Sequence, residues 1–183
     1  MVLVYSTFSS LLRLMNIICW NCRGAGGKGF PTLIRDLRRN YEAHLIILLE
    51  THISGDRGKI IRNKIGFDSC CVEEARGHSG GIWVLWDSHY WKVEAIQQHI
   101  QFIHLKIEGR DSMPWMLTAI YGSPQRLMRK SLWDNLRDLR NSVNLPWCTI
   151  GDFNAILHSY KKGEELLLKV VMLAPILYLA SRM

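Results

Sequence analysis

The chain has 183 residues, of which 48% are hydrophobic and 21% are charged. This length and composition are typical of one domain with a sizeable core, and they exclude a chain that is disordered throughout. The formal net charge of +7 favours an anionic partner, nucleic acid first, although charge alone indicates only non-specific attraction. An odd number of cysteines, five, is a poor basis for a disulfide framework and favours a reducing compartment.

Short apolar runs, which predict strands, alternate along the chain with amphipathic stretches, which predict helices. In chain order we expect a strand at 15–21, a helix at 31–41, a strand at 45–49, a helix at 56–66, strands at 80–87, 90–98, 101–109 and 115–124, a helix at 132–143 and a strand at 146–154. This mixture of buried strands, meander-like strands and covering helices predicts an α/β sandwich.

Periodicity within these elements predicts which sides are buried. The helix at 31–41 should bury Leu33, Ile34 and Leu37 on one face. In the strand at 101–109, polar or aromatic residues alternate with aliphatic ones, the period of a strand with one solvated face. The residues expected on that solvated face are Phe102, His104, Lys106 and Glu108.

Five polar residues stand where an apolar run stops: Asn21, Glu50, Tyr121, Asp152 and Asn154. In layered α/β folds, residues at strand ends project into a common mouth, so these five are expected to converge on one site. Singly, each has a plainer explanation. The asparagines could be turn residues, the glutamate a helix N-terminal acid, the aspartate a cap, and the tyrosine an edge aromatic with its hydroxyl in water.

A set of this composition suits metal-assisted hydrolysis of a phosphodiester. Mg²⁺ often takes only one or two protein carboxylates, so Glu50 alone could anchor it. Asp152 could orient and deprotonate the attacking water, Asn154 could hold that water or a phosphate oxygen, and Tyr121 could donate to the phosphate. Asn21 would position its neighbours.

Five motifs carry a resemblance to a known family. They are, in chain order, "WNCRG", "LLETH", "GHSGGIWVLW", "TAIYGSP" and "GDFNAIL". Together they resemble the endonuclease/exonuclease/phosphatase family, which includes DNase I, and most closely the endonuclease domain of plant LINE-type non-LTR retrotransposons. The resemblance implies a four-layer α-β-β-α sandwich, DNA as substrate and partner, and Mg²⁺ as cofactor, with Mn²⁺ as an alternative. It places Asn21, Glu50, Tyr121, Asp152 and Asn154 on the active-site positions of that family.

Two basic residues beside the first strand, Arg23 and Lys28, are candidates for contacts to a nucleic-acid backbone. By the same resemblance, Arg23 stands where abasic-site endonucleases place an aspartate. This difference argues against close kinship with that repair branch and is compatible with the retrotransposon branch.

The family pattern stops after Leu157. The family has a later aspartate and a terminal Ser-Asp-His motif, whereas this chain has no aspartate after Asp152 and only one later histidine, His158. We therefore expect an incomplete sandwich: an extension over 1–14, a C-terminally truncated domain over 15–160 and a divergent apolar tail over 161–183. The tail could cover the domain as a helix broken near Pro175.

Three functions stay open from the sequence. The first is a Mg²⁺-dependent DNA endonuclease domain of retrotransposon origin, weakly active or inactive because the terminal motifs are missing. The second is a non-catalytic nucleic-acid-binding remnant, and the third is a phosphatase of the same superfamily. No membrane segment is predicted, because Lys169 and Pro175 interrupt the apolar tail. An intracellular location is expected, with the nucleus as one option, and no protein partner can be inferred.

Overall fold

The computed structural model describes residues 2–6, 15–77, 79–110, 112–155 and 169–172. Its elements, in chain order, are β1 (Val2–Ser6), β2 (Met15–Asn21), α1 (Phe30–Asn40), β3 (Leu45–Leu49), α2 (Gly55–Ile65), β4 (Ser69–Glu73), β5 (Ile82–Trp86), β6 (Trp91–His99), β7 (Phe102–Gly109), β8 (Trp115–Tyr121), α3 (Arg126–Ser142), β9 (Trp147–Asp152) and β10 (Lys169–Met172). Every helix and strand expected over residues 15–154 is present, and β4 is an additional strand.

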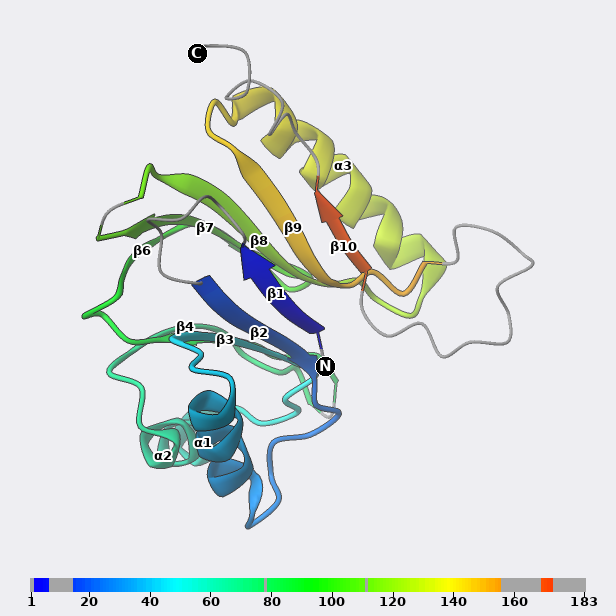
Figure 1. Cartoon of the computed structure of the whole chain (residues 1–183). Helices are drawn as coiled ribbons and strands as arrows, with labels where there is room; N and C mark the ends of the chain where they lie inside the picture. The colour runs from blue at the N-terminus through cyan, green and yellow to red at the C-terminus, as the bar shows by residue number, and fades with distance from the viewer. Residues whose placement is uncertain (1, 7–14, 78, 111, 156–168, 173–183) are drawn as a thin grey trace.

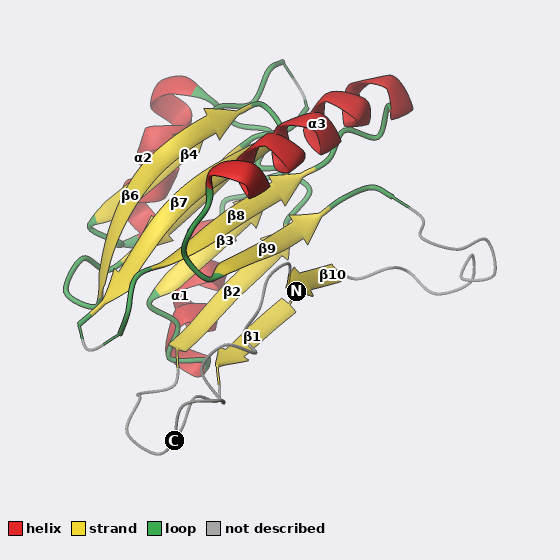
Figure 2. Cartoon of the chain, turned by 90° about the horizontal axis from the view of Figure 1, so that it is seen from above, coloured by secondary structure: helices red, strands yellow, loops and turns green. Residues whose placement is uncertain are grey.

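The strands form two five-stranded sheets that lie face to face (Figures 1 and 2). Their strand orders are β1-β2-β3-β5-β4 and β10-β9-β8-β7-β6. Each sheet contains one parallel pair, β2 with β3 and β8 with β9, and the other pairs are antiparallel. Because α1 connects β2 to β3 and α3 connects β8 to β9, each sheet carries one β-α-β unit.

Three clusters of buried apolar side chains fill the interfaces between the layers of the molecule. The first contains residues of both sheets, such as Ile47 and Leu105, and fills the space between the inner faces. The second joins α1 and α2 to the first sheet through residues such as Ile34 and Trp83. The third joins α3 to the second sheet through residues such as Leu136. The predicted four-layer α-β-β-α sandwich is confirmed.

The first helix forms largely as its sequence predicts. In α1, Pro31 lies at the start, where its missing N–H is no cost, and Arg38 and Arg39 lie in the last turn. Ile34 is buried, but Leu33 is 45% exposed, so the prediction that it faces the core is wrong. Leu33 lies next to Ile34 in sequence, about 100° away around the helix, and so turns toward solvent.

The prediction of a solvated face on β7 is wrong in its first half. Phe102 and His104 are 0% and 1% exposed. Helix α3 packs over this face and buries Leu132 and Leu136 against it. Lys106 and Glu108, farther along the strand, are half-buried. Period-two alternation therefore distinguishes the two faces of β7 but does not show which parts of a face are in solvent.

Strands β1 and β10 lie in the predicted extension and the predicted tail. β1 pairs antiparallel with β2, and β10 pairs antiparallel with β9. The expected helix is therefore wrong for residues 169–172, where pairing with the edge of the second sheet gives a strand. His158 and Pro175 lie outside the described residues, and the division of the chain at residues 15 and 160 stays a prediction.

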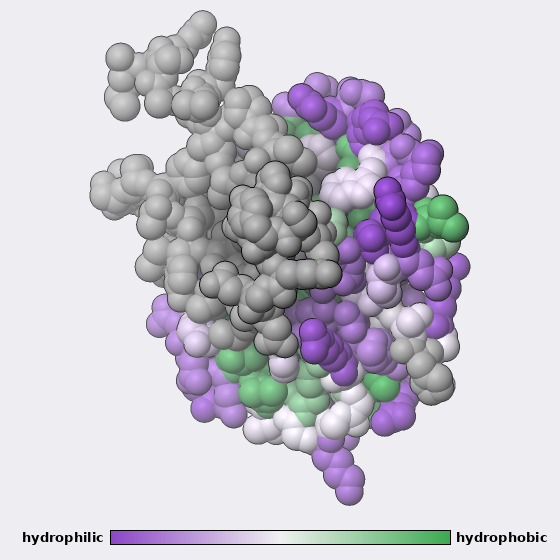
Figure 3. All heavy atoms as spheres, turned by 90° about the vertical axis from the view of Figure 1, so that its right-hand side faces the viewer, coloured by the Kyte–Doolittle hydropathy of each residue, from purple (hydrophilic) through white to green (hydrophobic). Residues whose placement is uncertain are grey.

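On the face that Figure 3 shows, polar side chains make up most of the surface formed by the described residues. Large hydrophobic side chains that are exposed include Leu127 at 88%, Met113 at 75% and Trp133 at 41%. All five cysteines are free thiols. Among the described helices, none combines the length and the hydropathy needed to cross a membrane.

Gly151, immediately before Asp152, occupies a position that only glycine suits. Its φ is +148°, and a Cβ built there would collide with the carbonyl oxygen of Ile120 on β8. We expect Gly151→Ala to lower the free energy of unfolding by about 3 kcal/mol. The control is Gly27→Ala, whose Cβ would meet nothing within 4 Å. Urea denaturation measures both, and equal stability of the two variants would contradict the packing described.

The environment of His104 predicts a pH-dependent stability. Its Nδ1 lies 2.7 Å from Thr118 Oγ1, which also accepts a hydrogen bond of 2.7 Å from Trp147 Nε1. The threonine hydroxyl is thus free to donate to a neutral imidazole. Burial lowers the pKa of His104 to about 4. In the unfolded chain the imidazole takes up a proton near pH 6.5, whereas in the folded protein it does so only near pH 4. The stabilisation that comes from burying neutral His104 is therefore complete above pH 6.5 and is lost as the pH falls toward 4.

The loss should approach about 3 kcal/mol between pH 6.5 and pH 4. His104→Gln, which can keep a hydrogen bond to Thr118, should lack this part of the dependence. Denaturation of both proteins across the pH range measures the difference. Parallel curves for the two proteins would show that His104 does not titrate in this way.

Candidate active site

The five polar residues expected at strand ends gather at one mouth of the sandwich. Asn21 ends β2, and Glu50 directly follows β3, the parallel neighbour of β2. Tyr121 and Asp152 end β8 and β9 and lie opposite each other in the parallel register. Parallel strands end at the same edge of a sheet, so each β-α-β unit brings two residues to this mouth. The fifth residue, Asn154, lies two positions after Asp152 in the sequence.

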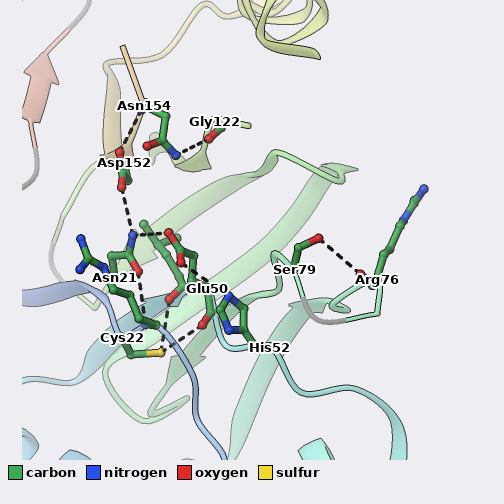
Figure 4. A network of polar contacts seen from close by, with 11 residues as sticks. Asn21, Cys22, Glu50, His52, Arg76, Ser79, Gly122, Asp152 and Asn154 are labelled. Carbon is green, nitrogen blue, oxygen red and sulfur yellow. Dashed lines mark hydrogen bonds and ion pairs between the residues drawn. The ribbon is translucent and has the colours of Figure 1, made fainter. Parts of the chain in front are cut away.

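The side-chain amide of Asn21 joins the two sheets (Figure 4). Its Nδ2 donates to Glu50 Oε1 at 2.7 Å and to Asp152 Oδ2 at 3.0 Å. Its Oδ1 accepts a hydrogen bond of 3.3 Å from the backbone N–H of Arg23. One amide nitrogen therefore holds two carboxylates that come from different sheets, and charge-assisted bonds of this kind are stronger than neutral ones.

Asp152 and Asn154 are fixed by a second set of bonds. The backbone N–H of Asn154 donates to Asp152 Oδ1 at 2.9 Å, so both oxygens of Asp152 accept hydrogen bonds. Asn154 Nδ2 donates to the carbonyl of Gly122 at 2.7 Å, and Gly122 N–H donates to the carbonyl of Asp152 at 2.7 Å. The local turn contact at this point is made by the side chain of Asp152, not that of Asn154, and it coexists with the contact of Asp152 to Asn21.

Tyr121 faces the carboxylates from the floor of the mouth. It ends β8, the central strand of its sheet, and is 9% exposed, so it is not an edge aromatic. Burial, followed by the negative charges of Glu50 and Asp152, raises the pKa of Tyr121 above its usual value. A hydrogen bond to the Glu50 carboxylate adds to this shift, so the protonated phenol acts as a hydrogen-bond donor at the site.

The backbone around the site is strained. Five described residues other than glycine have positive φ, and four of them, Arg23, Glu50, His52 and Asn154, lie at this mouth, with φ between 46° and 56°. Such conformations cost on the order of 1–3 kcal/mol each and occur preferentially at functional sites. Backbone bonds hold them, including Gly24 N–H to the carbonyl of Glu50 at 2.7 Å and His52 N–H to the carbonyl of Gly80 at 3.1 Å.

Two further residues lie near the site. The sequence leaves His52 open between a residue that reaches the site and a surface-loop histidine, and the structure places its Nε2 3.5 Å from Glu50 Oε2. Its spacing of two from Glu50 is the only signal. Gln101, in the turn between β6 and β7, is 2% exposed, and its Oε1 accepts a bond of 2.7 Å from Ser123 N–H. No feature of the sequence marks Gln101.

Arg23 and Lys28 both lie on the loop between β2 and α1 with exposed side chains. The backbone of Arg23 is bonded to Asn21, which places this residue at the rim of the mouth. Lys28 lies at the far end of the same loop, next to the start of α1. Arg23 thus contacts a residue of the site, whereas Lys28 shares only its loop with Arg23.

The oxygen donors fit a hard divalent cation. Among the described residues, no group of three or more His, Cys, Asp or Glu side chains is placed to hold a metal ion. Glu50 and Asp152 nevertheless present carboxylate oxygens that both lie within 3.0 Å of one amide nitrogen. Mg²⁺ takes one or two carboxylates and completes its octahedron with water and phosphate oxygens, so this small donor set is sufficient.

The four-layer sandwich with carboxylates and amides at the ends of its parallel strands defines a DNase I-like protein. The family model described as "Endonuclease/Exonuclease/phosphatase family" matches residues 18–163 of this chain. The chain therefore belongs to the endonuclease/exonuclease/phosphatase family, a family of hydrolases. The sequence has no match among curated proteins.

Solved structures agree with this fold. The endonuclease domain of TRAS1, a telomere-specific non-LTR retrotransposon, has a TM-score of 0.56 at 16% identity over 77% of this chain and 61% of its own. The AP endonuclease LMAP from Leishmania major has a TM-score of 0.56 at 17% identity over 79% and 56%. A family protein from Bacteroides thetaiotaomicron gives 0.56 at 11% identity over 76% and 63%. This chain thus spans less than two thirds of the length of each.

Gln101 should stabilise the segment between Tyr121 and α3. Its side-chain Nε2 donates to the backbone carbonyl of Met128 at 2.9 Å, and its backbone carbonyl accepts a bond of 2.8 Å from Tyr121 N–H. Gln101→Leu keeps the backbone bond but leaves the partners of the amide unpaired, and we expect a loss of about 2 kcal/mol in urea denaturation. The exposed Gln97 on β6 gives the matched control: Gln97→Leu should change stability by less than about 0.5 kcal/mol. Similar losses in both variants would contradict this role.

Proposed function

We propose that this chain is a Mg²⁺-dependent phosphodiester hydrolase, a DNA endonuclease domain of retrotransposon origin. The observation that carries the proposal is the contact of one amide, that of Asn21, with the carboxylates of Glu50 and Asp152. The motifs of plant LINE-type elements and the fold shared with the TRAS1 endonuclease domain support the retrotransposon origin. Mn²⁺ could replace Mg²⁺ in the same oxygen-rich site.

Glu50 is the residue proposed to hold the metal. When bound, Mg²⁺ would polarise the phosphate and offset the charge that develops on the leaving oxygen. Asn21 offsets the repulsion between the Glu50 and Asp152 carboxylates, because its amide nitrogen donates a hydrogen bond to each of them. Its role is therefore positional.

The remaining side chains act on the water and the phosphate. Asp152 is proposed to orient the attacking water and accept its proton, since its two oxygens are already fixed by Asn21 and by the backbone of Asn154. Asn154 would hold that water or a phosphate oxygen. Tyr121, kept protonated by its surroundings, would donate a hydrogen bond to the phosphate.

DNA is the proposed partner because the net charge of +7 attracts a polyanion. Arg23 at the rim and Lys28 on the same loop are proposed to contact phosphates outside the cleaved bond. Binding through such contacts weakens as the salt concentration rises. An intracellular location, with the nucleus as one option, is compatible with such a substrate.

The activity of the 183-residue chain is proposed to be weak or absent. Its sequence has no aspartate after Asp152 and no Ser-Asp-His motif. Losing a positioned acid or base often costs about 10² to 10⁴ in rate. The same feature favours a second candidate function, a non-catalytic remnant that binds nucleic acid through its basic surface.

A plasmid assay separates these functions. We expect the purified chain with Mg²⁺ to nick supercoiled DNA at least about 100-fold more slowly than DNase I. Glu50→Gln and Asp152→Asn should abolish this residual nicking. Glu108→Gln on β7, which removes a half-exposed charge paired with Lys92, is the control and should leave it unchanged.

Each outcome of the assay has a defined meaning. Rapid nicking that Glu50→Gln abolishes would contradict the predicted weakness but support the site. Nicking that survives both substitutions would contradict the endonuclease proposal. Salt-sensitive DNA binding without any nicking would support the remnant, and hydrolysis of small phosphoesters in preference to plasmid would support a phosphatase.

A further inference from the structure

His52 and Glu50 face each other at the mouth of the site, on the side of Glu50 away from Asn21. Glu50 Oε1 accepts the hydrogen bond from Asn21, whereas Oε2 lies 3.5 Å from His52 Nε2. The imidazole is 31% exposed and the Glu50 side chain 18%. Figure 4 shows the two side chains turned toward each other. The second oxygen of Glu50 is therefore directed at a nitrogen donor.

The backbone is bent in a way that produces this arrangement. Glu50 and His52 have φ values of 54° and 56°, in the left-handed region that residues other than glycine seldom occupy. Between them, Thr51 is fully buried, and its N–H donates to the carbonyl of Gly81. Two strained residues two positions apart in sequence thus present their side chains to the same place. Strain of this kind persists where the surrounding structure imposes it, and it is frequent at ligand sites.

The separation of the two atoms is longer than a usual hydrogen bond and close to the spacing of two ligands on one ion. An N–H···O bond usually spans about 2.7–3.2 Å, shorter than the 3.5 Å observed. Two donors bound to one cation at about 2.1 Å lie roughly 3.0–3.4 Å apart for angles between octahedral and tetrahedral. A small movement of either side chain would place both donors on one ion.

We propose that His52 is a nitrogen ligand of the divalent ion held by Glu50, and that it raises the affinity of the site for Mn²⁺ relative to Mg²⁺. This inference rests on the proposed metal role of Glu50. Mg²⁺ favours an environment of oxygen and water, whereas the affinity of a mixed nitrogen and oxygen site rises for transition-metal ions. His52 is thus a determinant of metal specificity, and the remaining positions on the ion are left to water and phosphate oxygens.

Metal binding to the full chain tests this proposal without relying on activity. Calorimetric titration with Mn²⁺ and with Mg²⁺ gives both affinities, and pulsed EPR of bound Mn²⁺ detects coupling to a ligating ¹⁴N nucleus. We expect His52→Ala to weaken Mn²⁺ binding about 10-fold or more, to change Mg²⁺ binding less than about 2-fold, and to remove the ¹⁴N coupling. His52→Asn, which tolerates positive φ better, should behave alike and controls for folding.

The controls separate this inference from the proposed function. His89→Ala, at an exposed turn between β5 and β6, should leave both affinities and the ¹⁴N coupling unchanged. If Glu50→Gln abolishes Mn²⁺ binding but His52→Ala and His52→Asn keep wild-type affinity and ¹⁴N coupling, the inference about His52 is wrong and the metal role of Glu50 stands. If Glu50→Gln binds Mn²⁺ as tightly as wild type, the metal role of Glu50 is wrong and the inference fails with it.

Discussion

The arrangement of the site depends on one side-chain amide between two carboxylates. Two ionised carboxylates this close repel each other, and partial burial strengthens that repulsion because the local dielectric is lower than in water. Asn21 offsets it by directing both hydrogens of one NH₂ group at Glu50 and Asp152. Because these carboxylates belong to different sheets, the contact exists only when the sandwich has closed. The chemistry proposed for the mouth thus requires the packing of the whole described core.

That packing explains why residues far apart in sequence meet. Apolar side chains on both inner faces bury each other, which fixes the distance and the angle between the sheets. The strands then act as rigid supports whose ends differ only in the polar residue they carry. At Gly151 the close approach of β8 and β9 removes all room for a side chain, and the next residue is Asp152. The tight backbone packing at Gly151 therefore also helps to fix the position of the Asp152 carboxylate.

Much of this structure could be predicted from the sequence because its signals are local. The buried run at 45–49 and the helix expected at 132–143 depend on neighbours along the chain, and both predictions are confirmed, with Leu132, Leu136 and Leu139 on the buried side of α3. The convergence of Asn21, Glu50 and Asp152 could be expected because strand ends share an edge. The roles assigned to these residues remain proposals. The predictions that were wrong concern contacts between layers: alternation along β7 does not reveal that α3 covers His104, and no local pattern shows that Gln101 holds the segment after Tyr121.

The two β-α-β units have a consequence for how the site is assembled. One unit, β2-α1-β3, supplies Asn21 and Glu50, and the other, β8-α3-β9, supplies Tyr121 and Asp152. Their boundary falls in the short connection between β5 and β6. Neither half of the polypeptide carries all four residues, so a chain cut at residues 87–90 would separate Asn21 and Glu50 from Tyr121 and Asp152. Two such pieces would have to rebuild the central hydrophobic layer to bring these side chains together again.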